Sequence, residues 1–108
     1  MQPEEFVYQI NRLTNHQWRL LEVLIKANNG WVSRRQIAKG IDKRRLIPYD
    51  ISCLQALHEG QLIDIEHIQD DTPIGYQVVY RISQQALVAI EQLNQLRQET
   101  GIPWATHQ

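Results

Sequence analysis

The chain has 108 residues, of which 43% are hydrophobic and 21% charged, with one cysteine and a formal net charge of −1. A chain of this length folds as one domain with a modest core, and a single cysteine excludes an intramolecular disulfide framework. No stretch approaches the roughly 20 apolar residues of a membrane span, and Glu4 and Glu5 stand where a signal peptide carries positive charge, so we expect a cytoplasmic protein with no membrane partner.

Two helices are predicted before residue 31. Apolar residues at helical spacing predict a short first helix over residues 3–13. Thr14 and Gln17 have the spacing of a capping box, in which a hydroxyl and an amide side chain satisfy backbone N–H groups at a helix start. The second helix should run to about Ala27 and end at residues 28–30, Asn-Asn-Gly, which tolerate the left-handed backbone of helix ends.

A short strand and two more helices are predicted next. Trp31-Val32 reads as a strand-like entry, and Ser33 with Gln36 repeats the capping box before a short helix that ends near Ile41. Residues 42–47 form a turn. Pro48 suits the first turn of the following helix, which runs to about Glu59, because its missing N–H has no helical partner there.

The period then changes from helix to strand. Alternating apolar and polar residues from Ile63 to Ile68 predict a half-buried strand, residues 69–75 contain turn formers, and residues 76–82 predict a returning strand. Ser83 can cap a final helix over residues 84–98, which is followed by an irregular tail.

Positive charge is concentrated in one segment of the chain. Residues 34–45 hold six basic side chains against Asp42 alone, a net of +5, whereas residues 46–108 hold eight acidic and two basic side chains, a net of −6. The basic side chains are Arg34, Arg35, Lys39, Lys43, Arg44 and Arg45. This asymmetry indicates an anionic partner, and a solvated charged face is the alternative.

The order of the predicted elements from Thr14 to about Ser83 resembles the winged helix-turn-helix family. The stretches that carry the resemblance are Trp18–Ile25, Trp31–Ala38, Leu54–Ile63 and Tyr80–Ser83. The added terminal helices are similar to those of MarR-like and PadR-like transcriptional regulators, in which they form the dimer. The resemblance implies an α+β, mainly α fold with a two-stranded β-hairpin wing, in one domain over 1–108 with an N-terminal helix (1–13), a winged-helix core (14–83) and a C-terminal helix and tail (84–108).

This resemblance implies a sequence-specific DNA-binding transcriptional regulator that acts as a homodimer on double-stranded DNA. The helix that starts at Pro48 would enter the major groove, and the positions that face the bases would be Tyr49, Ser52 and Gln55, with Asp50 and Ala56 as further candidates. Gln can pair with adenine, Ser with several bases, and Asp can accept from cytosine. The six basic residues of the 34–45 segment would neutralise phosphates.

Two features favour a different class of partner. The helix from Tyr49 to Glu59 contains no Lys or Arg, although Arg to guanine is the commonest specific contact. The wing tip holds Asp70 and Asp71, whereas a wing that contacts phosphate is normally basic. The alternative is therefore a winged-helix protein-interaction module, with a protein partner at the acidic wing and no direct DNA binding. Tyr49 likewise has two interpretations, a DNA contact and ordinary packing near a helix start.

The terminal helices carry more apolar residues than a small winged-helix core requires. Packing against their own core is one outlet for these side chains, and a twofold dimer interface is the other. The residues are Phe6, Val7, Ile10, Leu13, Leu87, Ile90, Leu93 and Leu96.

No pattern of residues indicates catalysis, a metal or a cofactor. The chain has no Gly-rich phosphate loop and no nucleophile elbow, and its four histidines share no metal-ligand spacing. Cys53 is interpreted as a small buried or half-buried hydrophobe, with a redox sensor as the alternative. We therefore expect a protein that is not an enzyme.

Overall fold

The computed structural model describes residues 2–69, 73 and 75–100, which form a mainly helical α+β winged helix, as predicted. The sheet is antiparallel, and β3 is its central strand in the order β1-β3-β2. In chain order the elements are α1 (Pro3–Asn11), α2 (Asn15–Lys26), β1 (Val32–Ser33), α3 (Arg34–Gly40), α4 (Pro48–Glu59), β2 (Ile63–Gln69), β3 (Tyr76–Ile82) and α5 (Gln84–Thr100).

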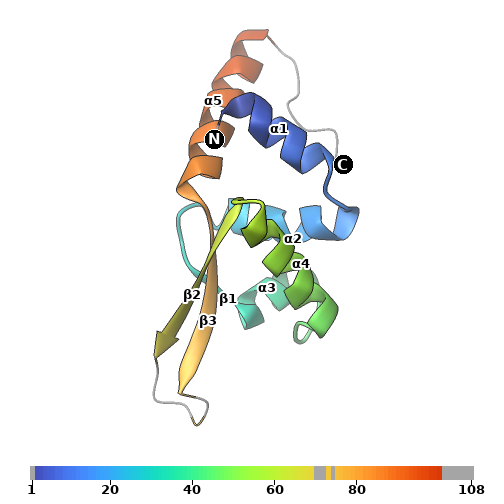
Figure 1. The fold of residues 1–108 in the computed structure, drawn as a ribbon, viewed down its shortest axis with the longest axis vertical. Coiled ribbons are helices and arrows are strands. Elements are labelled where there is room, and N and C mark those ends of the chain that lie inside the picture. Colours follow the sequence, from blue (N-terminus) through green and yellow to red (C-terminus); the bar gives the residue numbers. More distant parts are fainter. Residues whose placement is uncertain (1, 70–72, 74, 101–108) are drawn as a thin grey trace.

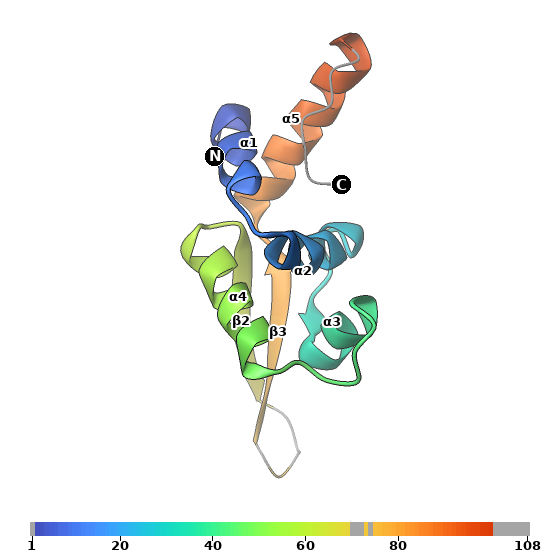
Figure 2. The same cartoon turned by 90° about the vertical axis from the view of Figure 1, so that its right-hand side faces the viewer.

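The elements are arranged along one long axis (Figure 1), with principal extents of 52 × 22 × 21 Å. Helices α1 and α5 lie together at one end, and the β2–β3 hairpin extends to the other. Helices α2, α3 and α4 lie between these ends and pack against the sheet (Figure 2). The end with α3, α4 and the hairpin therefore presents elements that the terminal helices leave uncovered.

Local signals in the sequence set the helix starts. Thr14 and Ser33 each accept a hydrogen bond from the backbone N–H of the Gln three residues later, at 3.1 Å, and each Gln side chain accepts one in return, which confirms both capping boxes. Helix α4 begins at Pro48 as predicted. Asn28 adopts a left-handed φ of 56° after α2, which confirms the predicted end of that helix.

The hairpin is also confirmed, with Ile65 opposite Tyr80 and Ile63 opposite Ile82. Strand β1 joins the free edge of β3 through Val32 and Ser33, so the strand-like entry is real although short. Ser83 accepts from the backbone N–H of Ala86 at 3.1 Å and so caps α5.

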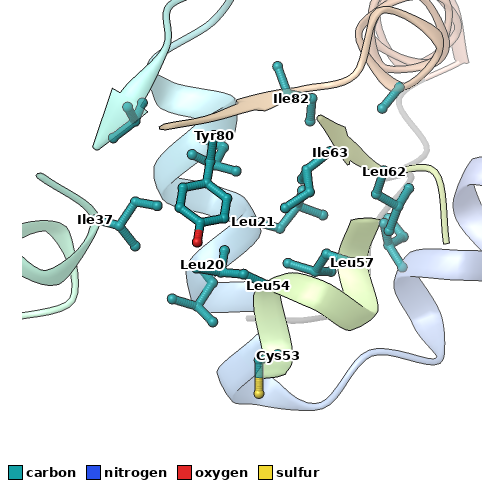
Figure 3. Close-up of a cluster of buried hydrophobic side chains, with 14 of the residues drawn as sticks. Leu20, Leu21, Ile37, Cys53, Leu54, Leu57, Leu62, Ile63, Tyr80 and Ile82 are labelled. Atoms are coloured by element: carbon teal, nitrogen blue, oxygen red, sulfur yellow. The ribbon is translucent and has the colours of Figure 1, made fainter. Parts of the chain in front are cut away.

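The core lies where α2 and α4 meet the sheet. Tyr80 is one of the largest fully buried side chains, and it lies among aliphatic residues from these helices (Figure 3). The central residues are Leu20, Leu21, Ile37, Leu54, Leu57, Leu62, Ile63 and Ile82, each at most 1% exposed. This packing fixes α4 against the hairpin, so the outer face of α4 is held in one orientation.

Most of the apolar residues of the terminal helices pack within the protomer. Phe6 and Ile10 of α1, and Ile90 and Leu93 of α5, belong to the core cluster. Leu96 instead remains 50% exposed on α5. Internal packing therefore accounts for much of the apolar surface of the terminal helices, and a dimer interface stays a prediction for the part that is exposed. Within the part of the chain that the structure describes, no helix has the length and apolarity to cross a bilayer.

Candidate nucleic-acid interface

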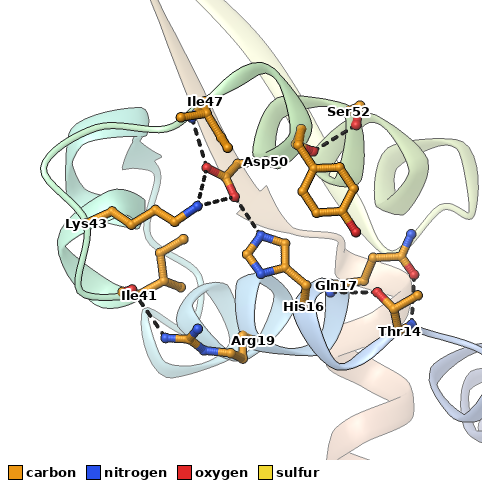
Figure 4. Close-up of polar contacts among 10 residues, drawn as sticks. Thr14, His16, Gln17, Arg19, Ile41, Lys43, Ile47, Asp50 and Ser52 are labelled. Atoms are coloured by element: carbon orange, nitrogen blue, oxygen red, sulfur yellow. Dashed lines mark hydrogen bonds and ion pairs between the residues drawn. The ribbon is translucent and has the colours of Figure 1, made fainter.

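A buried carboxylate organises the start of α4. Asp50 is 0% exposed, and its oxygens accept hydrogen bonds from three donors (Figure 4). The Ile47 backbone N–H donates at 2.9 Å, the Lys43 ammonium donates to both oxygens at 3.0 Å, and His16 Nε2–H donates at 2.6 Å. We call these residues the Asp50 network. It joins α2, the turn before α4 and the first turn of α4.

The interpretation of Asp50 as a residue that faces the bases is wrong. A carboxylate at the third position of a helix can bond the backbone N–H that precedes the helix, and this bond turns Asp50 inward. Burial by itself raises the pKa of the Asp50 carboxyl, but the hydrogen bonds from its three donors outweigh burial and hold the pKa below its ordinary value. Asp50 is therefore an ionised structural group.

Tyr49 lies between this network and solvent. Its ring stacks on the His16 ring with centroids 5.4 Å apart and 21° between the planes, yet 56% of the residue remains exposed. A hydrogen bond with the Cys53 side chain is the largest influence that raises the pKa of the Tyr49 phenol. Packing is therefore confirmed for one face of Tyr49, and the contact with DNA stays a prediction for the part that is accessible.

The other side chains on the outer face of α4 are small or polar. Ser52, Gln55 and Ala56 are exposed, as expected for residues that face a groove. The Ser52 hydroxyl donates to the Tyr49 carbonyl at 2.8 Å, so only its oxygen lone pairs are left to accept from a ligand. Cys53 and Leu54 lie on the opposite, buried face, and Cys53 is the small buried hydrophobe expected.

The six basic residues of 34–45 divide into three kinds. Lys43 is bound to Asp50, as described above. Arg34 is exposed, but its Nε donates to the buried Tyr80 hydroxyl at 2.9 Å. The remaining residues are exposed and have no side-chain hydrogen bond or ion pair within residues 2–69, 73 and 75–100; they are Arg35, Lys39, Arg44 and Arg45.

Four of the six basic residues of the 34–45 segment line one hollow beside α4. Its described lining consists of Arg34 and Arg35 from the start of α3, Arg44, Arg45 and Leu46 from the turn, and Ile51 from α4, and its volume is about 440 Å³. We call it the arginine hollow. The sequence placed the arginines in one segment, but it did not show that the two pairs converge.

The base of the wing carries a pair of side chains that sequence reasoning missed. The Arg81 guanidinium lies 4.2 Å above the centre of the Trp31 ring, and its Nη2 donates to Asp64 at 3.3 Å. This strand cation is therefore held against the sheet. The acidic tip of the wing, Asp70 and Asp71, lies outside the described residues, as does the tail with Trp104.

His16 is the other residue that sequence reasoning missed. It contacts both Asp50 and Tyr49, but Asp50 follows it by 34 positions, and no local pattern marks such a pair. Within the described residues no group of three or more His, Cys, Asp or Glu side chains is placed to hold a metal ion.

No protein-family model matches the chain, and no curated protein matches it significantly. Solved structures do share its fold. A mutant of MepR from a multidrug-resistant S. aureus clinical isolate superposes with a TM-score of 0.62 at 19% identity, over 92% of this chain and 67% of its own. A possible transcriptional regulator from Methanosarcina mazei Go1 gives 0.57 at 15% identity, over 92% and 88%.

A mutant of Lactococcus lactis ZitR gives a TM-score of 0.56 at 17% identity, over 82% of this chain and 55% of its own. The chain thus spans only part of the length of MepR and little more than half that of ZitR. These similarities confirm the winged-helix fold that the sequence predicts.

Proposed function

We propose that the protein is a sequence-specific DNA-binding transcriptional regulator that acts in the cytoplasm as a homodimer, and that it is not an enzyme. The observation that carries this proposal is that the arginine hollow is lined by Ile51 of α4, which directly precedes the exposed Ser52 and lies about one turn before the exposed Gln55. In a helix-turn-helix, the second helix enters the major groove while flanking groups contact phosphate. Structural neighbours that are regulators also support it.

The role that we propose for each residue follows from the chemistry of its side chain. Arg34, Arg35, Lys39, Arg44 and Arg45 neutralise phosphates and supply affinity that is independent of sequence. Gln55 can form a bidentate pair with adenine. Ser52 can accept from a base, and the exposed edge of Tyr49 can contact a base or sugar. Lys43 is left out of the phosphate set because Asp50 already binds its ammonium group.

The proposed homodimer uses the terminal helices. Tyr8 is 63% exposed on α1, and Val88 and Leu96 are 40% and 50% exposed on α5. A twofold interface through these residues would place two copies of α4 on half-sites about one DNA turn apart. Sedimentation of the protein alone tests this part of the proposal, since a monomer at micromolar concentration contradicts it.

The DNA proposal is tested by selecting a binding site from a random duplex library and then titrating the selected duplex by fluorescence anisotropy. With roughly four to five phosphates contacted per protomer, log K should fall with log salt concentration at a slope of about −4 per protomer. R44A/R45A should make the slope of log K against log salt concentration shallower by about 2 per protomer.

The matched control is K26E, which changes the net charge by the same two units at one exposed residue outside the 34–45 segment. It should leave the slope unchanged. If the library yields no enriched sequence, or if K26E and R44A/R45A change the slope equally, the proposal fails.

The second candidate function is a protein-interaction module. It is favoured by an exposed face of α4 that lacks Lys and Arg and lies next to the exposed side chain of Ile47, which is 46% accessible. Charge reversal at Asp70 and Asp71 would then weaken a complex with a co-purifying protein. If no protein co-purifies with the chain, and the same charge reversal tightens DNA binding, the protein is not an interaction module of this kind.

A further inference from the structure

The arginine hollow has the composition of a site for a multiply charged anion. Four arginines and two aliphatic residues make up its described lining, and none of these six residues is acidic. Its volume of about 440 Å³ falls within the range of sites that hold small molecules. Like charges around one hollow repel each other, so an anion that lies between them relieves this repulsion as well as forming its own ion pairs.

One wall of the hollow is held in place. Arg34 Nε donates to the Tyr80 hydroxyl at 2.9 Å, and Tyr80 is only 1% exposed in the centre of the core. This bond orients the Arg34 guanidinium and leaves its two terminal amino groups as donors. A guanidinium that is already oriented loses less freedom when it binds an anion, so Arg34 supplies a preorganised contact.

The other three arginines of the hollow are available to a ligand. Arg44 and Arg45, like Arg35, have no ion pair or side-chain hydrogen bond among the described residues. Arg rather than Lys is the residue whose planar fork binds phosphate oxygens in pairs. The two lysines of the segment, Lys39 and Lys43, are not among the lining residues.

The charge of the hollow selects among anions. The four positive charges of the arginines outnumber the one or two negative charges of a sulfate or an orthophosphate. A chain of linked phosphates instead carries several negative charges within a few bonds. Leu46 and Ile51 add an apolar part to the wall, and ion pairs next to apolar surface are screened less by water.

We propose that the arginine hollow binds a chain of closely spaced phosphates, as in inorganic tripolyphosphate or the triphosphate of a nucleotide, and that this ligand competes with DNA for the same arginines. The competition rests on the proposed function, but the site itself does not. Phosphate is the shared chemistry: the DNA backbone is one source and a free polyphosphate is the other. The site would make DNA release responsive to the concentration of a small polyanion.

Calorimetric titration with inorganic tripolyphosphate tests the site, with sulfate and orthophosphate titrated at equal ionic strength. We expect one tripolyphosphate per protomer, bound at least about tenfold more tightly than sulfate. R44A/R45A should weaken tripolyphosphate binding by about tenfold or more, and R44K/R45K, which keeps the charge but loses the forks, by about threefold or more.

K26E is the control for overall charge, and it should leave tripolyphosphate affinity within about twofold of the original. Thermal unfolding of each variant tests whether it is folded. Sulfate binding as tight as tripolyphosphate, equal losses in K26E and R44A/R45A, or unchanged binding in R44A/R45A each overturn the site.

Displacement from a preformed DNA complex tests the competition. Tripolyphosphate should release the labelled duplex over the concentration range of its own binding, whereas sodium chloride of equal ionic strength should release less. Saturable tripolyphosphate binding that leaves the DNA complex intact overturns the competition. If the protein binds tripolyphosphate but no DNA, the proposed function is overturned and the site is supported. If it binds DNA but no tripolyphosphate, the site is overturned and the proposed function is supported.

Discussion

Lys43 and Arg44 are neighbours in the sequence, yet the structure uses their positive charges in opposite ways. The Lys43 ammonium binds the buried Asp50 carboxylate at 3.0 Å and stabilises the turn before α4. Arg44 is exposed and lines an open hollow with three other arginines. One charge is therefore compensated within the protein, and the other is available to a ligand. The comparison shows that a run of basic residues can combine structural and ligand-binding cations.

The largest expected effect comes from removing the centre of the Asp50 network. Asp50→Ala leaves the Lys43 ammonium, the His16 ring and the Ile47 N–H without their acceptor, so the free energy of unfolding should fall by about 2–4 kcal/mol. Urea denaturation followed by circular dichroism measures this change. Ser52→Ala, two residues further along α4 on the exposed face, is the matched control, and we expect a change of less than about 0.5 kcal/mol. A loss at Asp50→Ala no larger than the control would contradict a structural role for the carboxylate.

The same carboxylate makes stability depend on pH. Because the pKa of Asp50 is lower in the folded protein than its ordinary value of 3.8, its contribution is fully present above that value and is lost as pH falls through the folded-state pKa. Unfolding curves recorded from neutral pH down to pH values below the ordinary pKa should therefore show a steeper loss for the original protein than for Asp50→Asn. Parallel curves would show that Asp50 is not the group responsible.

A smaller effect is expected where the outer face of α4 reads bases. Gln55→Ala should lower the affinity for the selected duplex by about 1–2 kcal/mol while leaving affinity for a scrambled duplex unchanged. R44A/R45A should instead weaken both duplexes alike, because phosphate contacts carry no sequence information. Anisotropy titrations of both variants on both duplexes test this difference. An equal loss on the two duplexes for Gln55→Ala would remove Gln55 from the base-reading set.

Much of the fold could be predicted because its signals are local. The Thr14–Gln17 and Ser33–Gln36 pairs lie within one helical turn, so their spacing alone specifies two helix starts. Alternation from Ile63 onward likewise predicts a strand. These features depend on residues that are adjacent in sequence, and the helix starts and the strand are confirmed. The half-buried face predicted for the strand is limited to its first residues, because residues 66–69 are exposed.

The candidate site was harder to predict because it depends on contacts between distant segments. The sequence identified the basic segment but could not distinguish Lys43 from Arg44, since the difference depends on Asp50 and His16 in other elements. Helical spacing puts Asp50 on the same face as Leu54 and Leu57, but a carboxylate is buried there only with donors such as Lys43 and His16, which no pattern within α4 indicates. The convergence of Arg34 with Arg45 depends on how the turn before α4 folds back toward the start of α3, which no local pattern specifies.

The measurement that tests the central claim most directly is the salt dependence of DNA binding for Lys43→Ala and Arg44→Ala, recorded side by side on the selected duplex. Both variants lose one positive charge from adjacent positions. We predict that Arg44→Ala makes the slope of log K against log salt shallower by about 1 per protomer, whereas Lys43→Ala leaves the slope unchanged and lowers the free energy of unfolding instead. Equal changes in slope for the two variants would contradict the division between a structural lysine and ligand-binding arginines.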